Sequence, residues 1–584
     1  MVKKTEENDD SQEQRVKELE KIRKRLAELE RGQKLGLVWR DIPEDVETLL
    51  RDEMPVLIHE PDLDISGKIS CDQSHILIEG DNLHALHVLQ ATHRNAIDVI
   101  YIDPPYNTGN DFVYNDLLID RENPWRHSAW LSFMSKRLKL AAELLAHDGI
   151  ILVSISDHEG AHLQLLMDEI FGEINRIGPI LWFYEGVNDN TALIKKTHEY
   201  ILVYRASPEI NFSRTIQDPN VVLDDVIENS VVKNGAKNPP SSIFLPAGFP
   251  ASFESGNIKK SEVKSLKVSE DIKVNGAKTL NGVTVTSGWS SRNILENFIN
   301  ASFSPVLDSK GQKTTFAITA AGNIVYRKIR DQSHVLSVIR NVGTVANAGA
   351  DLLKMGVDFD FPKPVGLIKY LIQLHGDADG IIVDFFAGTG TTLHAVAEIN
   401  ATDGGTRQCI LVTNNENGIC RDVTHPRIKA ALTGKWADKQ KHDPLPGSLS
   451  FYKTGFIKRL KSPDRMRTEI AKHTVDLIAI KEGAGTTVSR TADLTVLYGL
   501  NKTIAVVPGL DPDHVKLHAN AEKKVREGDR KTVYLFTWSD QGVEEETAAL
   551  WPGWVVQPLP SEMLAALRRN APLPSLFDVD GVSQ

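Results

Sequence analysis

Short, mostly apolar segments recur along this chain and alternate with segments of helical periodicity. The apolar segments, which we predict to be strands, are 75–78, 97–102, 150–155, 200–204, 381–386 and 409–413. The helices predicted between or after them are 82–92, 133–147, 162–171, 365–374 and 391–400. A strand that is apolar on both faces needs helices on both sides of its sheet. The alternation therefore predicts an α/β fold with a doubly wound, mostly parallel sheet.

The same regularity defines the predicted domains. Residues 1–35 are highly charged and form either an exposed helical arm or a solvated tail. The sheet occupies 36–207 and 351–433. Between these parts lies an inserted module, 208–350, in which polar and Gly-rich segments alternate with short β-prone runs. Residues 434–584 are predicted to form a separate, smaller C-terminal α/β domain.

The composition is that of an ordinary globular protein, with 41% hydrophobic and 25% charged residues among 584. The chain has no apolar run of about 18 residues and no apolar signal core near residue 1, so we expect a cytoplasmic protein that makes no membrane contact. Its 3 cysteines are too few and too scattered for a disulfide framework or a zinc cluster. Its 18 histidines include no metal-type spacing on a predicted helix, so we expect no bound metal.

The predicted strand at 97–102 runs directly into the motif Asp103-Pro104-Pro105-Tyr106. The Asp103 carboxylate and the Pro104 carbonyl are hydrogen-bond acceptors, and neither proline has an N–H to donate. The Tyr106 ring adds a flat apolar face. Such a set can hold the exocyclic amine of a nucleobase and stack on the base. The alternative is that the four residues are only a turn that ends the strand.

The predicted strand at 381–386 leads into a second motif, Phe386-Ala387-Gly388-Thr389-Gly390. Glycines between a strand and a helix let the backbone approach a nucleotide-like ligand closely. Leu393 stands where a dinucleotide-binding motif would have its third glycine, and no Gly-Lys-Ser/Thr follows. A smaller ligand that carries an adenosine and an amino-acid end, S-adenosyl-L-methionine, fits this turn better.

Together, the two motifs resemble those of DNA methyltransferases that modify an exocyclic amino nitrogen, and their order along the chain is that of the beta class. Further segments resemble the modification subunit of type III restriction–modification systems; they are 77–82, 106–112, 130–134, 167–173, 198–202 and 361–364. The resemblance is strong over 36–204 and 359–429. It implies a Rossmann-like, S-adenosylmethionine-dependent methyltransferase core, with its catalytic half at 36–207 and its cofactor half at 351–433.

The resemblance also implies roles in catalysis. Asp103 and the Pro104 carbonyl would each accept one N–H of adenine N6, while Pro105 completes the corner and Tyr106 stacks on the base. An Asp at the first motif position favours adenine, because N4-cytosine enzymes of this type usually carry Ser there. His198 would lie near the base pocket; alternatively, it serves only as a structural hydrogen-bonding residue.

On the cofactor side, Phe386, Gly388 and Gly390 would form the turn under the methionine end. Asp384 would fix this loop or contact the ammonium group of the cofactor. Three further candidates are implied for the adenine edge, the ribose and the carboxylate of the cofactor, in that order: Asp81, Glu416 and Lys363. Alternatively, Asp81 only caps the helix that follows it, and Lys363 is only a surface lysine.

We place target recognition in the inserted module, 208–350. The net charge, 67 − 78 = −11, is unusual for a protein that binds DNA, because phosphate contacts favour a basic surface. Lysines gather within 256–282, and the candidates for DNA contact are Lys259, Lys260, Lys264 and Lys267. The alternative is a lysine-rich solvated surface.

The sequence therefore predicts a site-specific methyltransferase that modifies N6 of an adenine flipped out of double-stranded DNA. By resemblance, it is a homodimer that pairs with an ATP-dependent restriction subunit, and residues 434–584 serve dimerisation or partner binding. Three alternatives remain open. They are a solitary adenine-N6 or cytosine-N4 methyltransferase, an enzyme that methylates RNA or protein, and a non-catalytic DNA-specificity module.

Overall fold

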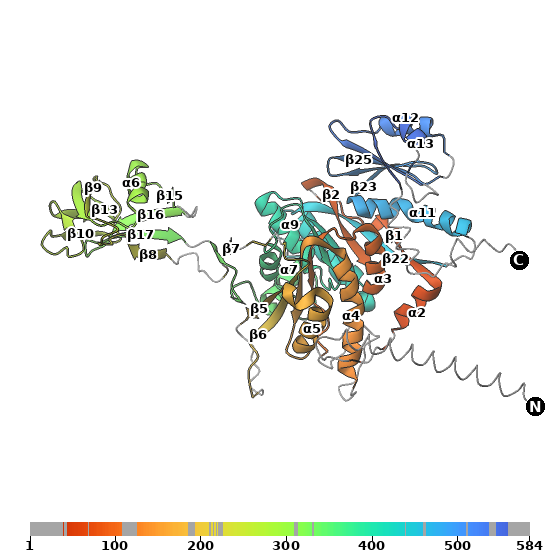
Figure 1. The fold of residues 1–584 in the computed structure, drawn as a ribbon, viewed down its shortest axis with the longest axis horizontal. Coiled ribbons are helices and arrows are strands. Elements are labelled where there is room, and N and C mark those ends of the chain that lie inside the picture. Colours follow the sequence, from red (N-terminus) through yellow and green to blue (C-terminus); the bar gives the residue numbers. More distant parts are fainter. Residues whose placement is uncertain are drawn as a thin grey trace, which may run out of the picture. The chain divides into compact units, whose positions relative to one another are not determined.

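The computed structural model describes residues 39, 42, 44–67, 69–107, 125–184, 193–209, 212–213, 215–217, 219, 226–308, 313–329, 332–438, 440–458, 463–509, 512–536, 543 and 545–558. The predicted arm at 1–35 lies outside these ranges. The chain forms two compact units (Figure 1): unit 1 comprises Met1–Ser213 and Ser337–Gln584, and unit 2 comprises Arg214–Leu336.

A ten-stranded sheet forms the centre of unit 1, in the order β1-β22-β2-β21-β20-β3-β4-β6-β5-β19. In that order the strands are Glu53–His59, Pro446–Lys458, Ile69–Glu79, Gln408–Thr413, Ile381–Asp384, Ile97–Ile102, Leu145–Ile155, His198–Arg205, Arg176–Phe183 and Val338–Ile339. All pairings from β22 through β4 are parallel, whereas β1 and β6 run antiparallel to their neighbours. The predicted mostly parallel α/β sheet is confirmed.

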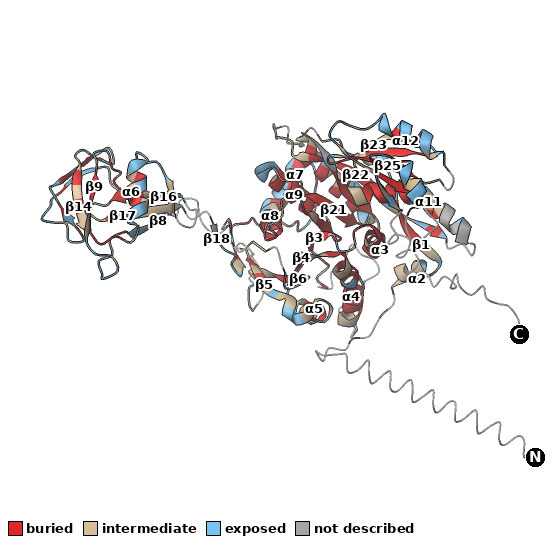
Figure 2. Ribbon diagram, turned by 45° about the horizontal axis from the view of Figure 1, so that its top comes forward, coloured by how far each residue is buried: buried red, intermediate tan, exposed pale blue. Residues whose placement is uncertain are grey.

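Helices pack on this sheet, and the buried residues gather where helices and strands meet (Figure 2). Those of the sheet region are α2 (Asp45–Asp52), α3 (Asn82–Thr92), α4 (Arg126–Leu144), α5 (Gly160–Met167), α7 (Val345–Met355), α8 (Val365–Ile372), α9 (Thr391–Asp403), α10 (His425–Thr433) and α11 (Pro463–Glu482). None of the helices in the described ranges combines the length and apolarity that crossing a bilayer requires.

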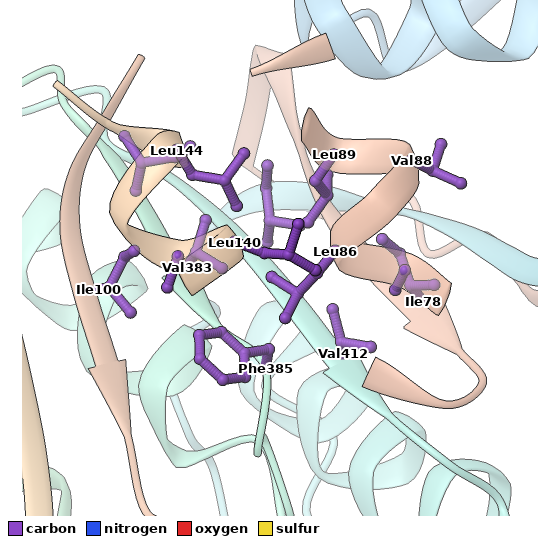
Figure 3. Packing of buried hydrophobic residues seen from close by; sticks show 14 of the residues in the cluster. Ile78, Leu86, Val88, Leu89, Ile100, Leu140, Leu144, Val383, Phe385 and Val412 are labelled. Atoms are coloured by element: carbon purple, nitrogen blue, oxygen red, sulfur yellow. The ribbon is translucent and has the colours of Figure 1, made fainter. Parts of the chain in front are cut away.

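The core of unit 1 forms where α3 and α4 pack on the central strands (Figure 3). Leu86 of α3 and Leu140 of α4 meet side chains of three neighbouring strand segments; these are Ile100, Val383, Phe385 and Val412. All of these strand residues are buried, in keeping with the continuous apolar runs of the sequence. Burial of a side chain of this size contributes roughly 1.5–3 kcal/mol, so this layer stabilises the strand ends that carry the two motifs.

Four strands of the sheet lie where the sequence indicated none; these are β1, β5, β19 and β22. β1 and β5 fall in parts of 36–207 where no strand was predicted. β19 falls within the predicted insert, 208–350, and β22 within 434–584, which was predicted to be separate from the sheet. β22 pairs in parallel with β2 and antiparallel with β1, so the chain returns to the sheet after α10. Residues 446–458 alternate apolar and polar types only in part, and their place depends on pairing with strands some 370 to 400 positions away.

Beyond β22 the chain builds a second, five-stranded sheet, in the order β23-β24-β25-β26-β27. Its strands are Thr486–Arg490, Thr495–Gly499, Lys502–Val507, Arg530–Leu535 and Val555–Pro558, and its helices are α12 (His514–Glu522) and α13 (Glu545–Ala549). It has a core of its own that includes Val496, Val533 and Trp551. This is a smaller α/β sheet of the kind predicted for the C-terminal region.

Unit 2 is built mainly of short antiparallel strands in four small sheets, with the single described helix α6 (Arg292–Asn300). The strands are β7 (Thr215–Gln217), β8 (Val226–Ser230), β9 (Ser241–Leu245), β10 (Ser255–Ile258), β11 (Lys267–Val268), β12 (Ile272–Asn275), β13 (Lys278–Thr279), β14 (Val283–Ser287), β15 (Val306–Leu307), β16 (Lys313–Ile318), β17 (Ile324–Ile329) and β18 (Gln332–His334). Phe249, Phe298 and Phe316 pack in its core. The module predicted at 208–350 encloses this unit, while β19 and α7 within that range belong to unit 1.

Candidate active site

The two sequence motifs follow neighbouring parallel strands. β20 pairs with β3 in register, Ile382 with Val99 and Val383 with Ile100. The carboxyl ends of both strands therefore lie at the same edge of the sheet, which is where α/β folds bind their ligands. A cavity of about 190 Å³ opens there, lined from one motif by Asp103, Pro104 and Pro105 and from the other by Phe386, Ala387 and Gly388.

At the Asp103 corner, four polar side chains form one network. The Tyr106 hydroxyl donates to Asp103 Oδ1 at 2.8 Å and lies 3.0 Å from Glu199 Oε2. Lys363 Nζ lies 3.0 Å from Asp103 Oδ2, 3.1 Å from Glu199 Oε2 and 2.9 Å from the Tyr106 hydroxyl. One ammonium group thus stands between two carboxylates, and the aromatic ring of the motif is held through its hydroxyl.

Burial and the charges of this network change the pKa values of Tyr106 and Lys363. Burial raises the pKa of Tyr106 well above its ordinary value, and the charges of Asp103 and Glu199 add to that effect. Burial disfavours the charged form of Lys363, but the two carboxylates outweigh it and raise the pKa of Lys363 above its usual range. Tyr106 is therefore a neutral phenol and Lys363 a cation at neutral pH.

Glu199 is a site residue that the sequence analysis missed. It is the second residue of β6, one position after His198, which was the candidate. The His198 ring instead packs edge-to-face on Tyr200, with 5.1 Å between ring centroids. Side chains of consecutive strand residues point to opposite faces, so Glu199 and not its neighbour shares a face with the network. A carboxylate at the start of a predicted strand was the available signal.

The main chain of the Asp103 corner is held from outside the motif. Trp130 of α4 donates its indole N–H to the Pro105 carbonyl at 2.7 Å. Asn107, with φ of 54°, donates from Nδ2 to Glu159 Oε1 at 2.5 Å. Trp130 was noted only as part of a resembling segment, because an indole far along the chain gives no local sign of its partner. These two bonds hold Pro105, the third residue of the motif, and Asn107, the residue that directly follows the motif.

The glycine motif forms a tight turn between β20 and α9. Gly388 and Gly390 have φ of +49° and +76°, a region that favours glycine. The Asp384 carboxylate accepts from the Phe386 N–H at 3.0 Å and from the Thr392 hydroxyl at 2.5 Å, and burial raises the pKa of Asp384 to about 7. Asp384 therefore closes the turn and lines the cavity as well.

Arg427 of α10 stabilises the same turn through hydrogen bonds to two of its threonines. It donates to the Thr389 and Thr391 hydroxyls at 2.6 and 2.7 Å, and burial lowers the pKa of Arg427 to about 9. α9 begins at Thr391 without a side-chain cap, so N–H groups of its first turn are available to an anionic group in the cavity.

Two of the remaining cofactor candidates have structural partners. Asp81 caps α3 by accepting from the Leu83 N–H at 2.8 Å, and it lies 3.6 Å from Arg137. Glu416 lies in a short 3-10 turn, Glu416–Gly418, 3.4 Å from the Asn414 side-chain amide. Asn414 lines the cavity. Cofactor contacts of Asp81, Glu416 and Lys363 stay predictions.

Comparison with known families identifies the type of site. The sequence profile of the N6/N4 DNA methylase family, described as "DNA methylase", matches residues 97–421, a span that contains both motifs. The chain belongs to this family. S-adenosyl-L-methionine, the methyl donor of DNA methylases, is its cofactor.

Curated relatives of this DNA methylase include modification enzymes of two types. It is 31% identical over 394 residues to the type III restriction-modification enzyme StyLTI Mod subunit of Salmonella typhimurium strain LT2, covering 62% of this chain and 56% of that one. It is 30% identical to the EcoPI Mod subunit of Escherichia phage P1, covering 59% and 58%. The type II methyltransferase M.KpnI of Klebsiella pneumoniae is 30% identical, covering 65% and 87%. The chain thus spans little more than half of the two Mod subunits.

Among solved structures, a putative DNA modification methylase from Thermus thermophilus, complexed with S-adenosyl-L-methionine, matches with a TM-score of 0.29 at 13% identity. The match covers 65% of this chain and 97% of that one. The cytosine-N4-specific PvuII DNA methyltransferase matches with a TM-score of 0.29 at 12% identity, covering 60% and 86%. Neither likeness bears on the activity or the target base of this chain.

The cavity residues of the DNA methylase fit S-adenosyl-L-methionine. At Gly388 an added Cβ would meet a single atom, the Phe386 carbonyl oxygen at 3.8 Å, so bare backbone faces the cavity here. The first turn of α9 offers N–H groups to a carboxylate, and the buried Asp384 is an acceptor for an ammonium group. Phe359 and Phe361 add apolar surface to the lining. These N–H donors, the carboxylate acceptor and the apolar surface suit a ligand that has a zwitterionic amino-acid end and an apolar part.

Proposed function

We propose that this DNA methylase is a site-specific adenine-N6 methyltransferase, which acts on an adenine extruded from duplex DNA. The observation that carries the proposal is the shared cavity, in which the acceptor corner at Asp103 and the glycine turn at Gly388 face one space. Methyl transfer requires an amine and a methyl donor within van der Waals reach, and two motifs that line one cavity meet that requirement.

Asp103 and the Pro104 carbonyl would each accept an N–H of the target amine. That arrangement turns the nitrogen lone pair toward the glycine turn and stabilises the positive charge that develops on nitrogen. When bound, S-adenosyl-L-methionine supplies an electrophilic methyl group on its sulfonium. Lys363 pairs with one oxygen of the Asp103 carboxylate and holds it in place, and the Tyr106 hydroxyl fixes the other carboxylate oxygen. The proton released from the amine passes to solvent, because no described group of this network is a free base.

The decisive experiment compares the wild type with Asp103→Asn. Each protein is incubated with plasmid DNA and labelled S-adenosyl-L-methionine, and the nucleosides are then separated by mass spectrometry. We expect N6-methyladenine from the wild type and a loss of at least about 100-fold in the variant, since asparagine replaces one acceptor oxygen by a donor and removes the negative charge that stabilises the developing cation. Cofactor affinity by calorimetry should be unchanged.

The matched control is Asp379→Asn, which removes an exposed carboxylate from the loop before β20. It should methylate like the wild type. N4-methylcytosine in place of N6-methyladenine would transfer the proposal to the other amine of the family. Unchanged methylation by Asp103→Asn would refute the assigned role of the corner.

We further propose that the protein is the modification subunit of a type III restriction–modification system, acting as a homodimer with an ATP-dependent restriction subunit. Similarity to the StyLTI and EcoPI Mod subunits supports this, while the similarity to M.KpnI supports a type II or solitary enzyme as the alternative. Co-expression with a type III restriction subunit, followed by light scattering of the purified protein, separates the two. A stable methylase that never retains the nuclease favours the alternative.

Unit 2 is our candidate for target recognition. The lysines proposed to contact phosphate are exposed on its strands and turns: Lys259, Lys260, Lys264 and Lys267. Only weak local contacts engage two of them. Lys259 lies 3.9 Å from Glu262, and the Lys260 ammonium donates to the Ser269 carbonyl at 3.0 Å. Such exposed cations are available to DNA phosphates at little cost.

A further inference from the structure

Two histidines and a buried glutamate meet behind the Asp103 corner. Glu159 directly precedes α5 and its side chain is fully buried, His162 lies in the first turn of α5, and His127 lies in the first turn of α4. His127 Nδ1 is 2.6 Å from Glu159 Oε1, and His162 Nδ1 is 3.0 Å from Glu159 Oε2. The two imidazole rings are 4.7 Å apart at an angle of 37°. All three donor atoms lie within 4.8 Å of one another.

The hydrogen bonding of this cluster is incomplete. Glu159 Oε2 and His162 Nδ1 are both buried, and neither has a hydrogen-bond partner among the described residues. They are close enough to bond, but their geometry does not allow it. A buried carboxylate oxygen without a donor costs free energy and calls for an explanation, and a missing ion is a common one.

We propose that His127, Glu159 and His162 bind a divalent transition-metal ion, with Zn²⁺ as the ion that suits them best. Two imidazole nitrogens and one carboxylate are a usual ligand set for zinc. Glu-x-x-His spacing places Glu159, the N-cap of α5, and His162 of its first turn on one face. Around a zinc ion at about 2.1 Å from each ligand, donor atoms stand roughly 3.4 Å apart. The two histidine–carboxylate contacts, at 2.6 and 3.0 Å, therefore need to open by less than about 1 Å each.

The sequence analysis expected no metal, because it found no metal-type histidine spacing on a predicted helix. His127 lies 32 positions from Glu159 and on another helix, so no local spacing reports this cluster. The fold brings them together where α4 and α5 pack. Both histidine side chains are about one-third exposed, so an ion could enter from solvent and keep a water ligand. Harder ions such as Mg²⁺ prefer oxygen ligands and do not suit this set.

An ion here would act on the active site through Asn107. The Asn107 amide donates to Glu159 Oε1, and this oxygen has a second lone pair for the metal. The ion would thereby fix the carboxylate that holds Asn107 in its left-handed conformation, directly after Tyr106. One contact opposes binding: Arg126 Nε donates to His127 Nε2 at 3.2 Å. Metal on Nδ1 leaves a proton on Nε2, so this guanidinium has to turn away.

The test uses the full-length protein without a histidine tag, stripped with EDTA and dialysed. Co²⁺ is titrated while its visible absorption is recorded, and Zn²⁺ is titrated by calorimetry and by competition with Co²⁺. We expect one equivalent of each ion per chain, and a visible spectrum of a four- or five-coordinate site. Glu159→Gln and His162→Ala should each lower the affinity by at least about 100-fold, because each removes a ligand.

The matched control is His158→Ala, which removes an exposed histidine adjacent to Glu159 and should leave binding unchanged. His162→Cys restores a zinc ligand and should recover binding, which separates loss of a ligand from loss of folding. The proposal is overturned if the stripped wild type binds less than one equivalent, or if Glu159→Gln or His162→Ala binds as the wild type does. The cluster would then be a metal-free hydrogen-bonded support for Asn107. Since metal binding is read without methyl transfer, failure of the proposed function leaves this result intact.

Discussion

The ammonium group of Lys363 lies 3.0 Å from Asp103 Oδ2, the carboxylate that we propose accepts the target amine. These residues are 260 positions apart and come from different halves of the sheet, Asp103 from the end of β3 and Lys363 from the segment before α8. The carboxylate therefore has a cation as its partner before DNA arrives. An incoming amine has to share this oxygen with Lys363 or displace it.

Lys363→Met is expected to lower kcat by about 100-fold at pH 7. Without the ammonium group, the Asp103 carboxylate loses the contact at 3.0 Å that positions it toward the amine. The measurement is kcat at pH 7, together with cofactor affinity. The control is Lys369→Met, which removes a lysine of α8 that pairs with Glu398 of α9. A large loss of cofactor affinity with unchanged kcat would instead support the role of Lys363 toward the cofactor carboxylate.

Trp130→Phe removes one hydrogen bond from the corner while keeping an aromatic ring in the core. The Pro105 carbonyl loses the indole N–H at 2.7 Å, which should cost about 1–2 kcal/mol of stability and allow the corner to move. We expect kcat to fall by about 10-fold at nearly constant cofactor affinity. Single-turnover kinetics and thermal unfolding measure the two effects. Trp436→Phe, at an indole stacked on His442, should change neither the rate nor the affinity.

Asp384→Asn should change the pH dependence of stability. Burial raises the pKa of Asp384 to about 7, above its value in an unfolded chain, so the folded state binds this proton more tightly. The stabilisation from this proton is present at pH 5.5 and lost as the pH rises through 7, which amounts to about 2 kcal/mol between pH 5.5 and 8. Unfolding midpoints of both proteins at the two pH values test this. Parallel curves for wild type and variant would show that Asp384 does not titrate in this range.

Replacement of Lys259, Lys260, Lys264 and Lys267 by alanine should weaken DNA binding and flatten its salt dependence. Each phosphate contact that is lost lowers the slope of log affinity against log salt concentration by about 1. Fluorescence anisotropy at several salt concentrations measures this slope. The control removes two exposed lysines that follow α12, Lys523 and Lys524. An unchanged slope in the fourfold variant would favour a merely solvated surface.

Local sequence patterns predicted the interior of the sheet well. The bounds expected for α3 and β3 are those of the structure, because Asp81 caps the start of α3 and the Asp103-Pro104 corner ends the largely apolar β3. β22 was not predicted, although it is 13 residues long. Its place between β1 and β2 depends on pairing with strands near the other end of the chain, and a mixed pattern of apolar and polar residues does not report such pairing.

The candidate site divides in the same way. Its two motifs were readable because each joins a buried strand to unusual backbone chemistry: prolines without N–H groups in one, and glycines with positive φ in the other. What the amino-acid sequence determined by itself was therefore the strand-and-helix alternation, the acceptor corner at Asp103 and the glycine turn at Gly388. Only the tertiary structure decided that Lys363, Glu199 and Trp130 reach that corner and that His127 meets Glu159. Such contacts join residues 25 to 260 positions apart, and strand order and helix packing bring them together, which no local pattern encodes.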